Sequence, residues 1–256
     1  MENRRNPVGR TLQLVSFMAE NDPARAWGVR ELASRMGIPL GAIHRALVGL
    51  EEQGWVERGD GGSYTLSLEV FRMAMSLSSS LPLRRAALPV MHEITVACSE
   101  TALLGMFDHS RLQMSFIAQV ESPHPLRYAI DLNRWSPIHA GATGLAIFAF
   151  LEPEVQEAVF ARGDFTVKTE NTITAPARLR EELAMIRARG YALTKGQRIL
   201  GSVGVAAPIF GPSGAVIGDL AITLPTERFE RVENPEILAA SVVRHADKIS
   251  QKLRWK

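Results

Sequence analysis

The chain has 256 residues, with 29 Lys and Arg against 27 Asp and Glu, for a formal net charge of +2. This length allows two domains with a sizeable core, and 46% apolar with 22% charged residues is typical of globular proteins. The single cysteine, Cys98, excludes an intrachain disulfide and a cysteine metal cluster. The sequence shows neither a membrane-span pattern nor a signal-peptide core. We therefore expect a cytoplasmic protein with no membrane partner.

The N-terminal part begins with three predicted helices. Residues 8–20 carry apolar side chains at helical spacing, and Asp22-Pro23 ends this helix before a second one begins in residues 28–32. Gly37 lets the chain reverse after the second helix. Ile43, Leu47 and Leu50 then recur at i, i+4 and i+7, which indicates one buried face of a third helix.

A short hairpin follows the third helix. Gly54 ends that helix, and strand-like runs at residues 55–58 and 63–66 flank a glycine-rich turn at residues 59–62. Helix, turn, helix and a two-stranded wing, in this order, predict a winged helix-turn-helix over residues 1–66. In such a module the last helix enters the major groove of DNA. A small helical subdomain with a surface hairpin is the alternative.

The predicted DNA-binding domain is not basic overall, because residues 1–60 contain eight Arg and eight acidic residues. The prediction that this domain binds DNA therefore depends on the positions of its arginines. Arg4 and Arg5 belong to an N-terminal arm, and Arg45 lies on the reading helix, where it can pair with guanine or contact the backbone. We expect salt-sensitive binding. The candidate DNA contacts are Arg10, Arg30, Pro39, Leu40, Gly41, Ala42, His44, Arg45, Arg58, Ser63 and Tyr64.

Residues 67–82 form the predicted connection between two domains. Leu68, Phe71 and Met75 make an apolar stripe on a helix that we expect to end near residue 77, where Ser78–Pro82 interrupts the pattern. So much apolar surface is unusual for a solvated linker. The helix either packs on its own domain or pairs with a second copy of the chain, and we favour the pairing.

Residues 83–256 predict an α+β domain. A helix over residues 83–99 precedes a hairpin of strands at 101–108 and 112–120, and a third strand is expected at Leu126–Ile130. A loop of small residues, 136–144, leads into an apolar helix at 145–151. The remaining pattern predicts helices at 152–160, 176–189 and 235–253, and strands at 192–194, 203–210 and 215–224. Consecutive hairpins favour an antiparallel sheet with helices on it.

Several motifs resemble those of the IclR family of bacterial transcription regulators over nearly the whole chain. They are Ile43–Leu47, Leu50–Val56 and Tyr64–Leu66 in the first domain, with Pro137–Ala140, Gly144, Ala146, Arg189–Ala192 and Gly204–Phe210 in the second. The resemblance implies a GAF/PAS-like effector domain and a homodimer, often a dimer of dimers. It also implies operator DNA and a small-molecule effector as partners, with RNA polymerase added if the protein is an activator.

The chain departs from the family pattern at several positions. Gly41-Ala42 replaces a Ser-Thr pair at the start of the reading helix, so two hydroxyls that would contact phosphate are missing. The segment after the Gly-Tyr strand, Thr194–Arg198, is neutral to basic where relatives are often acidic. Gly204 stands where some relatives have cysteine. These departures indicate a different ligand from that of the best-known members.

The loop before the apolar helix is the candidate ligand site. Backbone N–H groups at a helix N-terminus favour an anion, although small residues suit simple packing equally. The resemblance places effector contacts at Ala142, Thr143, Thr194, Ser202, Gly204, Ala221 and Thr223, and Gly144 belongs to the same loop. Arg198 is the candidate counter-charge for an organic or aromatic acid, ahead of Arg111, Arg127 and Arg134.

No catalytic set is visible. His139 has no second histidine or carboxylate at ligand spacing, so a structural hydrogen bond is favoured over a metal or general-base role. Cys98 stands alone, without a nucleophile–base–orienter arrangement. We expect no cofactor and no metal. The leading hypothesis is a ligand-responsive transcription regulator; the alternatives are a regulator whose second domain only oligomerises and a GAF-fold enzyme.

Overall fold

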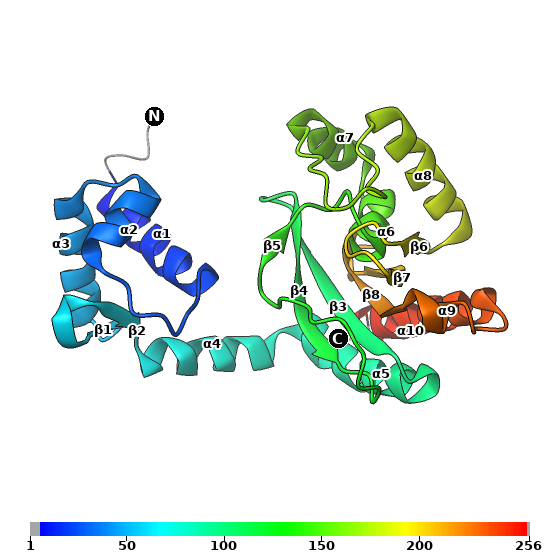
Figure 1. Cartoon of the computed structure of the whole chain (residues 1–256), viewed down its shortest axis with the longest axis horizontal. Coiled ribbons are helices and arrows are strands. Elements are labelled where there is room, and N and C mark those ends of the chain that lie inside the picture. The colour runs from blue at the N-terminus through cyan, green and yellow to red at the C-terminus, as the bar shows by residue number, and fades with distance from the viewer. Residues whose placement is uncertain (1–5, 255–256) are drawn as a thin grey trace. The chain divides into compact units, whose positions relative to one another are not determined.

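The computed structural model describes residues 6–254, so the predicted arm residues Arg4 and Arg5 lie outside the described part. The chain divides into two compact units, Met1–Ser80 and Leu81–Lys256 (Figure 1). No helix of the described residues is long and apolar enough to cross a membrane.

The first unit is a winged helix-turn-helix. Its elements are α1 (Pro7–Glu20), α2 (Val29–Met36), α3 (Leu40–Glu52), β1 (Val56–Arg58), β2 (Tyr64–Leu66) and α4 (Leu68–Ser80). The turn after α2 depends on Gly37, which has a φ of 63° that side chains disfavour. The strands β1 and β2 pair antiparallel, as the hairpin pattern predicts.

A separate core holds this unit together. Leu14 and Met18 of α1 pack with Ile43 and Leu47 of α3, and the fully buried ring of Trp27 closes the cluster. Trp27 also exchanges two backbone hydrogen bonds with Tyr64, which ties the start of α2 to the wing. The predicted buried face of the third helix is therefore confirmed.

Helix α4 differs from the prediction in length. The helix continues through Ser78–Ser80, whose hydroxyls at positions 79 and 80 bond to carbonyls three residues back, and Leu81 alone separates it from α5 (Pro82–Cys98). Serine disfavours a helix only weakly, so three serines do not end one. None of the residues of α4 is buried.

The second unit is built on a six-stranded antiparallel sheet. The strands are β3 (Thr101–Asp108), β4 (Gln113–Val120), β5 (Trp135–Ser136), β6 (Ala192–Lys195), β7 (Ser202–Phe210) and β8 (Val216–Pro225). Their order across the sheet is β5-β4-β3-β8-β7-β6. The helices after α5 are α6 (Ala142–Phe150), α7 (Pro153–Arg162), α8 (Pro176–Arg189), the short α9 (Thr226–Phe229) and α10 (Pro235–Arg254).

The prediction of a third strand at Leu126–Ile130 is wrong. This segment is irregular, and β4 pairs instead with the two residues of β5. The carbonyl of Leu126 accepts a hydrogen bond from Arg228, whose guanidinium also binds both oxygens of the buried Glu100 at 2.7 Å. The segment is therefore held by a side chain of α9 rather than by a strand ladder.

Helices cover both faces of the sheet. Alternate residues of β8 show this: Leu220 and Ile222 pack with α5 and α10, while Ala221 packs with α6 and α8. Figure 1 shows these two helix layers on opposite sides of the strands. Period-2 alternation places the two sets on opposite faces.

Helix α6 lies very close to the strand–loop backbone that precedes it. The segment is buried from Ala142 to Ala149, and a Cβ on Gly144 would lie 2.5 Å from the carbonyl oxygen of Ile138. Only a residue without a side chain permits this approach. The predicted loop therefore ends earlier than expected, because residues 142–144 already form the first turn of α6.

Two helical glycines give a matched test of this contact. We expect Gly144→Ala to lower the free energy of unfolding of the second unit by about 2–4 kcal/mol, because the new methyl group overlaps the backbone. A Cβ on Gly49 in α3 would meet nothing within 4 Å. Gly49→Ala should therefore stabilise the first unit by roughly 0.5–1 kcal/mol. Calorimetry should show the two transition temperatures moving in opposite directions; a lowered transition in both variants would contradict this account.

Candidate functional site

The outer surface of α3 is the candidate DNA-reading surface. Leu40, Gly41, His44 and Arg45 are exposed, while Ile43 and Leu47 face the core. The first turn of α3 contains no acidic residue, and its N-cap, Pro39, offers no side-chain acceptor. The first peptide N–H groups of the helix are therefore available to an anion such as a DNA phosphate.

Arg45 lies back along α3 toward its N-terminus. A Cβ on Gly41 would be 3.5 Å from Nη1 of Arg45, so the missing side chain leaves room for the guanidinium. The positive charge of Arg45 therefore lies beside Gly41, at the N-terminal end of α3. The family resemblance leads one to expect a hydroxyl-bearing side chain at this position.

The other predicted DNA contacts fall into two groups. Arg30 of α2 and Arg58 of the wing are exposed, and Arg10 and Ser63 are half-buried. Tyr64 differs, because its ring is only 1% exposed and belongs to the core. Its assignment as a DNA contact is corrected: Tyr64 supports the wing, and the Arg58 guanidinium lies 5.9 Å from its ring centroid.

A small cavity in the second unit lies on the α6 face of the sheet. Its volume is about 50 Å³. Eight of the nine predicted effector residues line it: Ala142, Thr143, Thr194, Arg198, Ser202, Gly204, Ala221 and Thr223. Gly144 is the exception, since it packs against the Ile138 backbone. The cavity therefore unites residues from α6, three strands and the loop after β6.

Arg198 is the charged group of this cavity. Its Nη2 donates to the hydroxyl of Ser136 at 3.1 Å, and its guanidinium lies 5.4 Å from the ring centroid of Phe116. Among the described residues no carboxylate oxygen comes within 4.0 Å of it. Burial lowers the pKa of Arg198, against the weaker opposing effect of Asp131. The guanidinium nevertheless stays charged at neutral pH, so among the described residues it has no counter-ion within 4.0 Å.

Close backbone contacts shape the rest of the cavity. A Cβ on Gly204 would lie 3.0 Å from the Cβ of Ala142, so α6 and β7 meet through two of the smallest residues. The hydroxyl-bearing residues Thr143, Thr194, Ser202 and Thr223 supply the polar part of the lining. A pocket of this kind, mostly apolar with a few convergent polar groups, suits a small organic ligand.

Sequence reasoning missed the apolar part of the lining. Leu103, Phe116, Ile130 and Ile199 also face the cavity. They come from β3, β4 and two irregular segments, and no local pattern links them. The other candidate arginines lie elsewhere: Arg127 pairs with Glu121 at 2.7 Å, and Arg111 lies 5.1 Å from the ring centroid of Trp135.

His139 has the structural environment that the sequence favours. Its Nε2 lies 2.9 Å from the carbonyl oxygen of Thr166, and the ring is 1% exposed. Burial lowers its pKa, so the imidazole is neutral at pH 7. No group of three or more His, Cys, Asp or Glu residues that could hold a metal occurs within residues 6–254.

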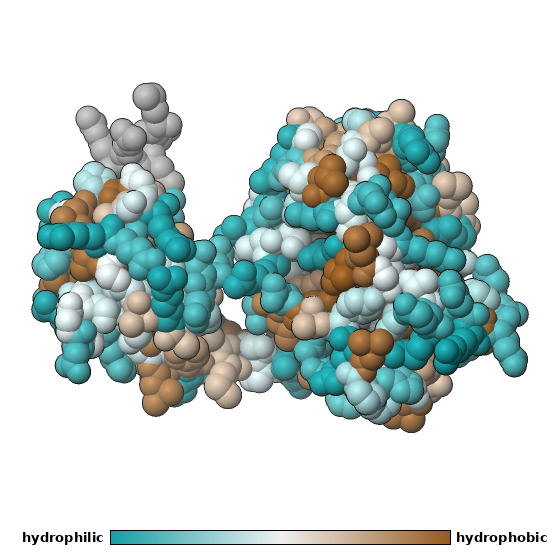
Figure 2. Space-filling model, in the orientation of Figure 1, coloured by the Kyte–Doolittle hydropathy of each residue, from teal (hydrophilic) through white to brown (hydrophobic). Residues whose placement is uncertain are grey.

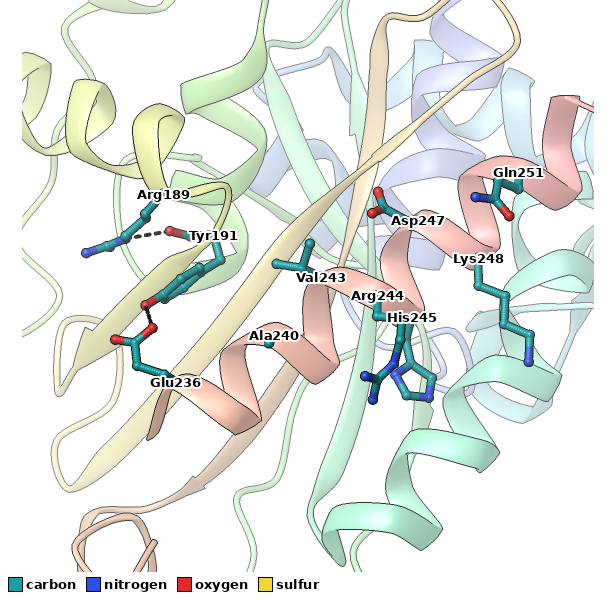
Figure 3. Close-up of a pocket in the computed structure, with 10 residues that line it drawn as sticks. All are labelled: Arg189, Tyr191, Glu236, Ala240, Val243, Arg244, His245, Asp247, Lys248 and Gln251. Carbon is teal, nitrogen blue, oxygen red and sulfur yellow. Dashed lines mark hydrogen bonds between the residues drawn. The ribbon is translucent and has the colours of Figure 1, made fainter. Parts of the chain in front are cut away.

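A wider hollow of about 670 Å³ lies on the other helix layer, beside α10 (Figure 3). Its charged groups have both signs and several are already paired. Figure 3 shows Arg189 donating to the carbonyl of Tyr191, whose hydroxyl donates to Glu236 at 3.0 Å. None of the predicted effector residues lines this hollow. Its charged side chains that have no salt bridge among the described residues are exposed to solvent, whereas Arg198 is half-buried.

Comparison with known proteins agrees with this architecture. The model of the bacterial transcriptional regulator IclR C-terminal domain matches residues 75–251, and the IclR helix-turn-helix model matches residues 7–60. The transcriptional repressor IclR of Escherichia coli (strain K12) is 28% identical over 220 residues, which cover 86% of this chain and 80% of that protein. The regulator KipR of Bacillus subtilis (strain 168) is 27% identical over the full length of both chains.

Solved structures show the same fold. A putative IclR transcriptional regulator from Silicibacter sp. TM1040 superimposes with a TM-score of 0.82 at 27% identity, over 97% of this chain and 96% of that chain. An IclR homolog from Microbacterium hydrocarbonoxydans, complexed with 4-hydroxybenzoate, has a TM-score of 0.82 at 24% identity, over 98% and 100%. With a winged helix-turn-helix, an antiparallel α+β second unit and both family models matched, the chain belongs to the IclR family of bacterial DNA-binding transcription regulators.

Proposed function

We propose that this chain is a cytoplasmic homodimeric regulator whose operator binding is controlled by a small organic acid in the Arg198 cavity. The observation that carries the proposal is the half-buried guanidinium of Arg198, which has no carboxylate partner within 4.0 Å among the described residues. A buried charge without a counter-ion is costly. A carboxylate ligand would remove that cost, and Arg binds carboxylates with good geometry.

The first turn of α6 supports the same ligand class. Residues 142 and 143 lie at a helix N-terminus that no side chain caps, and both of them line the cavity. The partial positive charge of a helix start favours an anion. The complex of the Microbacterium relative with 4-hydroxybenzoate, itself a carboxylic acid, is consistent with this class.

The cavity is small for such a ligand. Pockets that enclose drug-sized ligands measure roughly 300–1,000 Å³, whereas this cavity measures about 50 Å³. Either the effector has few atoms or its entry moves the irregular segment that contributes Ile130. Any ligand-driven change of DNA affinity requires the effector to bind one conformation of the protein more tightly than another.

Pairing of two chains is proposed from α4. Leu68 is 78% exposed, Phe71 37% and Met75 72%, and these three apolar side chains follow one stripe of α4. Figure 2 shows apolar surface in the region that α4 occupies in Figure 1. A contiguous apolar face on a helix with no buried residue is typical of an interface. A dimer of dimers, and contact with RNA polymerase if the regulator activates, extend this proposal; catalysis forms no part of it.

Arg45 provides the test of DNA reading. We expect Arg45→Ala to weaken binding to the chain's own upstream DNA about tenfold and to reduce the salt slope of log K by roughly 0.9, the value for one lost phosphate contact. Fluorescence anisotropy across a potassium chloride series measures both. Arg178→Ala, at an exposed arginine of α8, is the matched control and should leave both unchanged. If the two variants bind DNA with equal affinity and equal salt dependence, α3 is not part of the DNA interface.

Met75 provides the test of pairing. A charge in the centre of an apolar interface is strongly unfavourable, so Met75→Glu should raise the dimer dissociation constant at least about tenfold. Sedimentation velocity over a range of protein concentrations measures the change. Ser76→Glu adds the same charge one residue along α4 and is the control. A dimer that survives Met75→Glu unchanged would show that α4 is not the pairing surface.

Arg198 provides the test of ligand class. We expect Arg198→Gln to reduce affinity for small carboxylates about tenfold to hundredfold, because hydrogen bonds to a charged group are worth about 1.5–3 kcal/mol. Titration calorimetry with benzoate, 4-hydroxybenzoate, propionate and lactate measures it, with Arg178→Gln as the control. Wild-type protein that binds none of these acids would favour a second unit that only oligomerises.

A further inference from the structure

One buried acid in the second unit lacks a hydrogen bond of ordinary geometry. Asp219 of β8 is 0% exposed, and neither of its carboxyl oxygens makes such a bond among the described residues, although the Thr143 hydroxyl and the Gly105 peptide face the carboxyl group. An unpaired polar group in the interior is costly and rare in folded proteins. Its position therefore requires an explanation.

The neighbouring strand has a vacant side-chain position that Asp219 occupies. Asp219 pairs with Gly105 of β3 in the sheet register. A Cβ on Gly105 would overlap Oδ1 of Asp219 and would lie 2.9 Å from Cγ2 of Thr143. The three residues form one contact cluster, and Gly105 is the residue that makes room for the carboxyl group.

Thr143 links this cluster to the ligand cavity. It is 7% exposed, belongs to the first turn of α6, and lines the cavity together with Arg198. Ala221 and Thr223, which follow Asp219 at two and four residues on the same face of β8, line the cavity as well. Asp219 thus contacts a residue of the cavity wall, Thr143, without lining the cavity itself.

Burial raises the pKa of Asp219 well above its usual value, while the Thr143 hydroxyl and the Gly105 peptide act in the opposite direction. Burial thus favours the protonated carboxyl group, which has one proton to donate. The Gly105 N–H can only donate. Of the two facing groups, only Oγ1 of Thr143 can accept that proton.

We propose that Asp219 is a positioning residue for effector selection: it donates to the Thr143 hydroxyl, which then directs its own proton into the cavity. This inference rests on the proposed function, in which Arg198 holds the carboxylate of the effector. Thr143 would donate to a second oxygen of the same molecule. The preferred effector is then an acid that carries an oxygen on the carbon next to the carboxylate, rather than the unsubstituted acid.

Two matched pairs of acids test this selection. Lactate and propionate differ by one 2-hydroxyl group, as do mandelate and phenylacetate, so the pairs sample a small and a larger ligand. Titration calorimetry on the full-length protein gives the affinity ratio within each pair. We expect wild-type protein to prefer the hydroxy acid of at least one pair about fivefold to tenfold, the range of one net hydrogen bond.

Variants at positions 143 and 219 separate positioning from mere stability. Asp219→Asn keeps a donor for Thr143 and an acceptor for the Gly105 N–H, so the ratio should persist. Asp219→Ala and Thr143→Val should each bring the affinity ratio close to one. The double variant that carries both substitutions should show no lower ratio than Thr143→Val alone. A purely structural role would weaken both acids of a pair equally and leave the ratio intact. Thermal unfolding checks that each variant is folded.

Each outcome has a distinct meaning. A wild-type ratio near one, a ratio that survives Asp219→Ala, or one lost in Asp219→Asn would overturn the role of Asp219 while leaving the acid pocket in place. Failure of wild-type protein to bind any of these four acids, and also benzoate and 4-hydroxybenzoate, would instead overturn the acid-binding function itself.

Discussion

The close approach of helix α6 to the backbone beneath it is the constraint on which the second unit depends. Gly144 lies against the Ile138 carbonyl, and Ala142 lies against Gly204 of β7. Side chains at either contact would push the helix away from the sheet. Because the helix starts so close to the strands, its first peptide groups, the Arg198 guanidinium and the hydroxyls of β7 and β8 converge on one small cavity.

The same closeness sets the electrostatics of the site. A charge that is partly withdrawn from water is costly without a partner, yet half-buried Arg198 has the Ser136 hydroxyl as its side-chain hydrogen-bond partner among the described residues. Asp219 is fully buried, and burial raises its pKa and so favours its neutral form. Arg198 keeps its charge, so the cavity has a positive character that a carboxylate ligand would neutralise.

The sequence predicted most of the fold because its signals were local. The apolar periodicity of α3, the glycine at the α2–α3 turn and the hairpin of β3 and β4 each require only neighbouring residues. The resemblance to IclR regulators supplied seven of the fifteen cavity residues, and the choice of Arg198 as a counter-charge added an eighth.

The sequence-based predictions failed where residues far apart in the chain determine the structure. Leu126–Ile130 has a strand-like composition, but the open edge of β4 is taken by β5. Tyr64 ends a wing strand, and only tertiary packing with the helices shows that its ring faces inward. Asp219 escaped notice because the glycine that accommodates it lies more than a hundred residues earlier in the chain.

Helix α4 has 13 residues and none of them is buried. Isolated helices of this length are marginal in water, and this last helix of the first unit has no buried residue to stabilise it. If a second chain packs against α4, the order of this helix depends on protein concentration. Dilution would then separate the chains and weaken the coupling between effector binding and DNA binding before either unit unfolds.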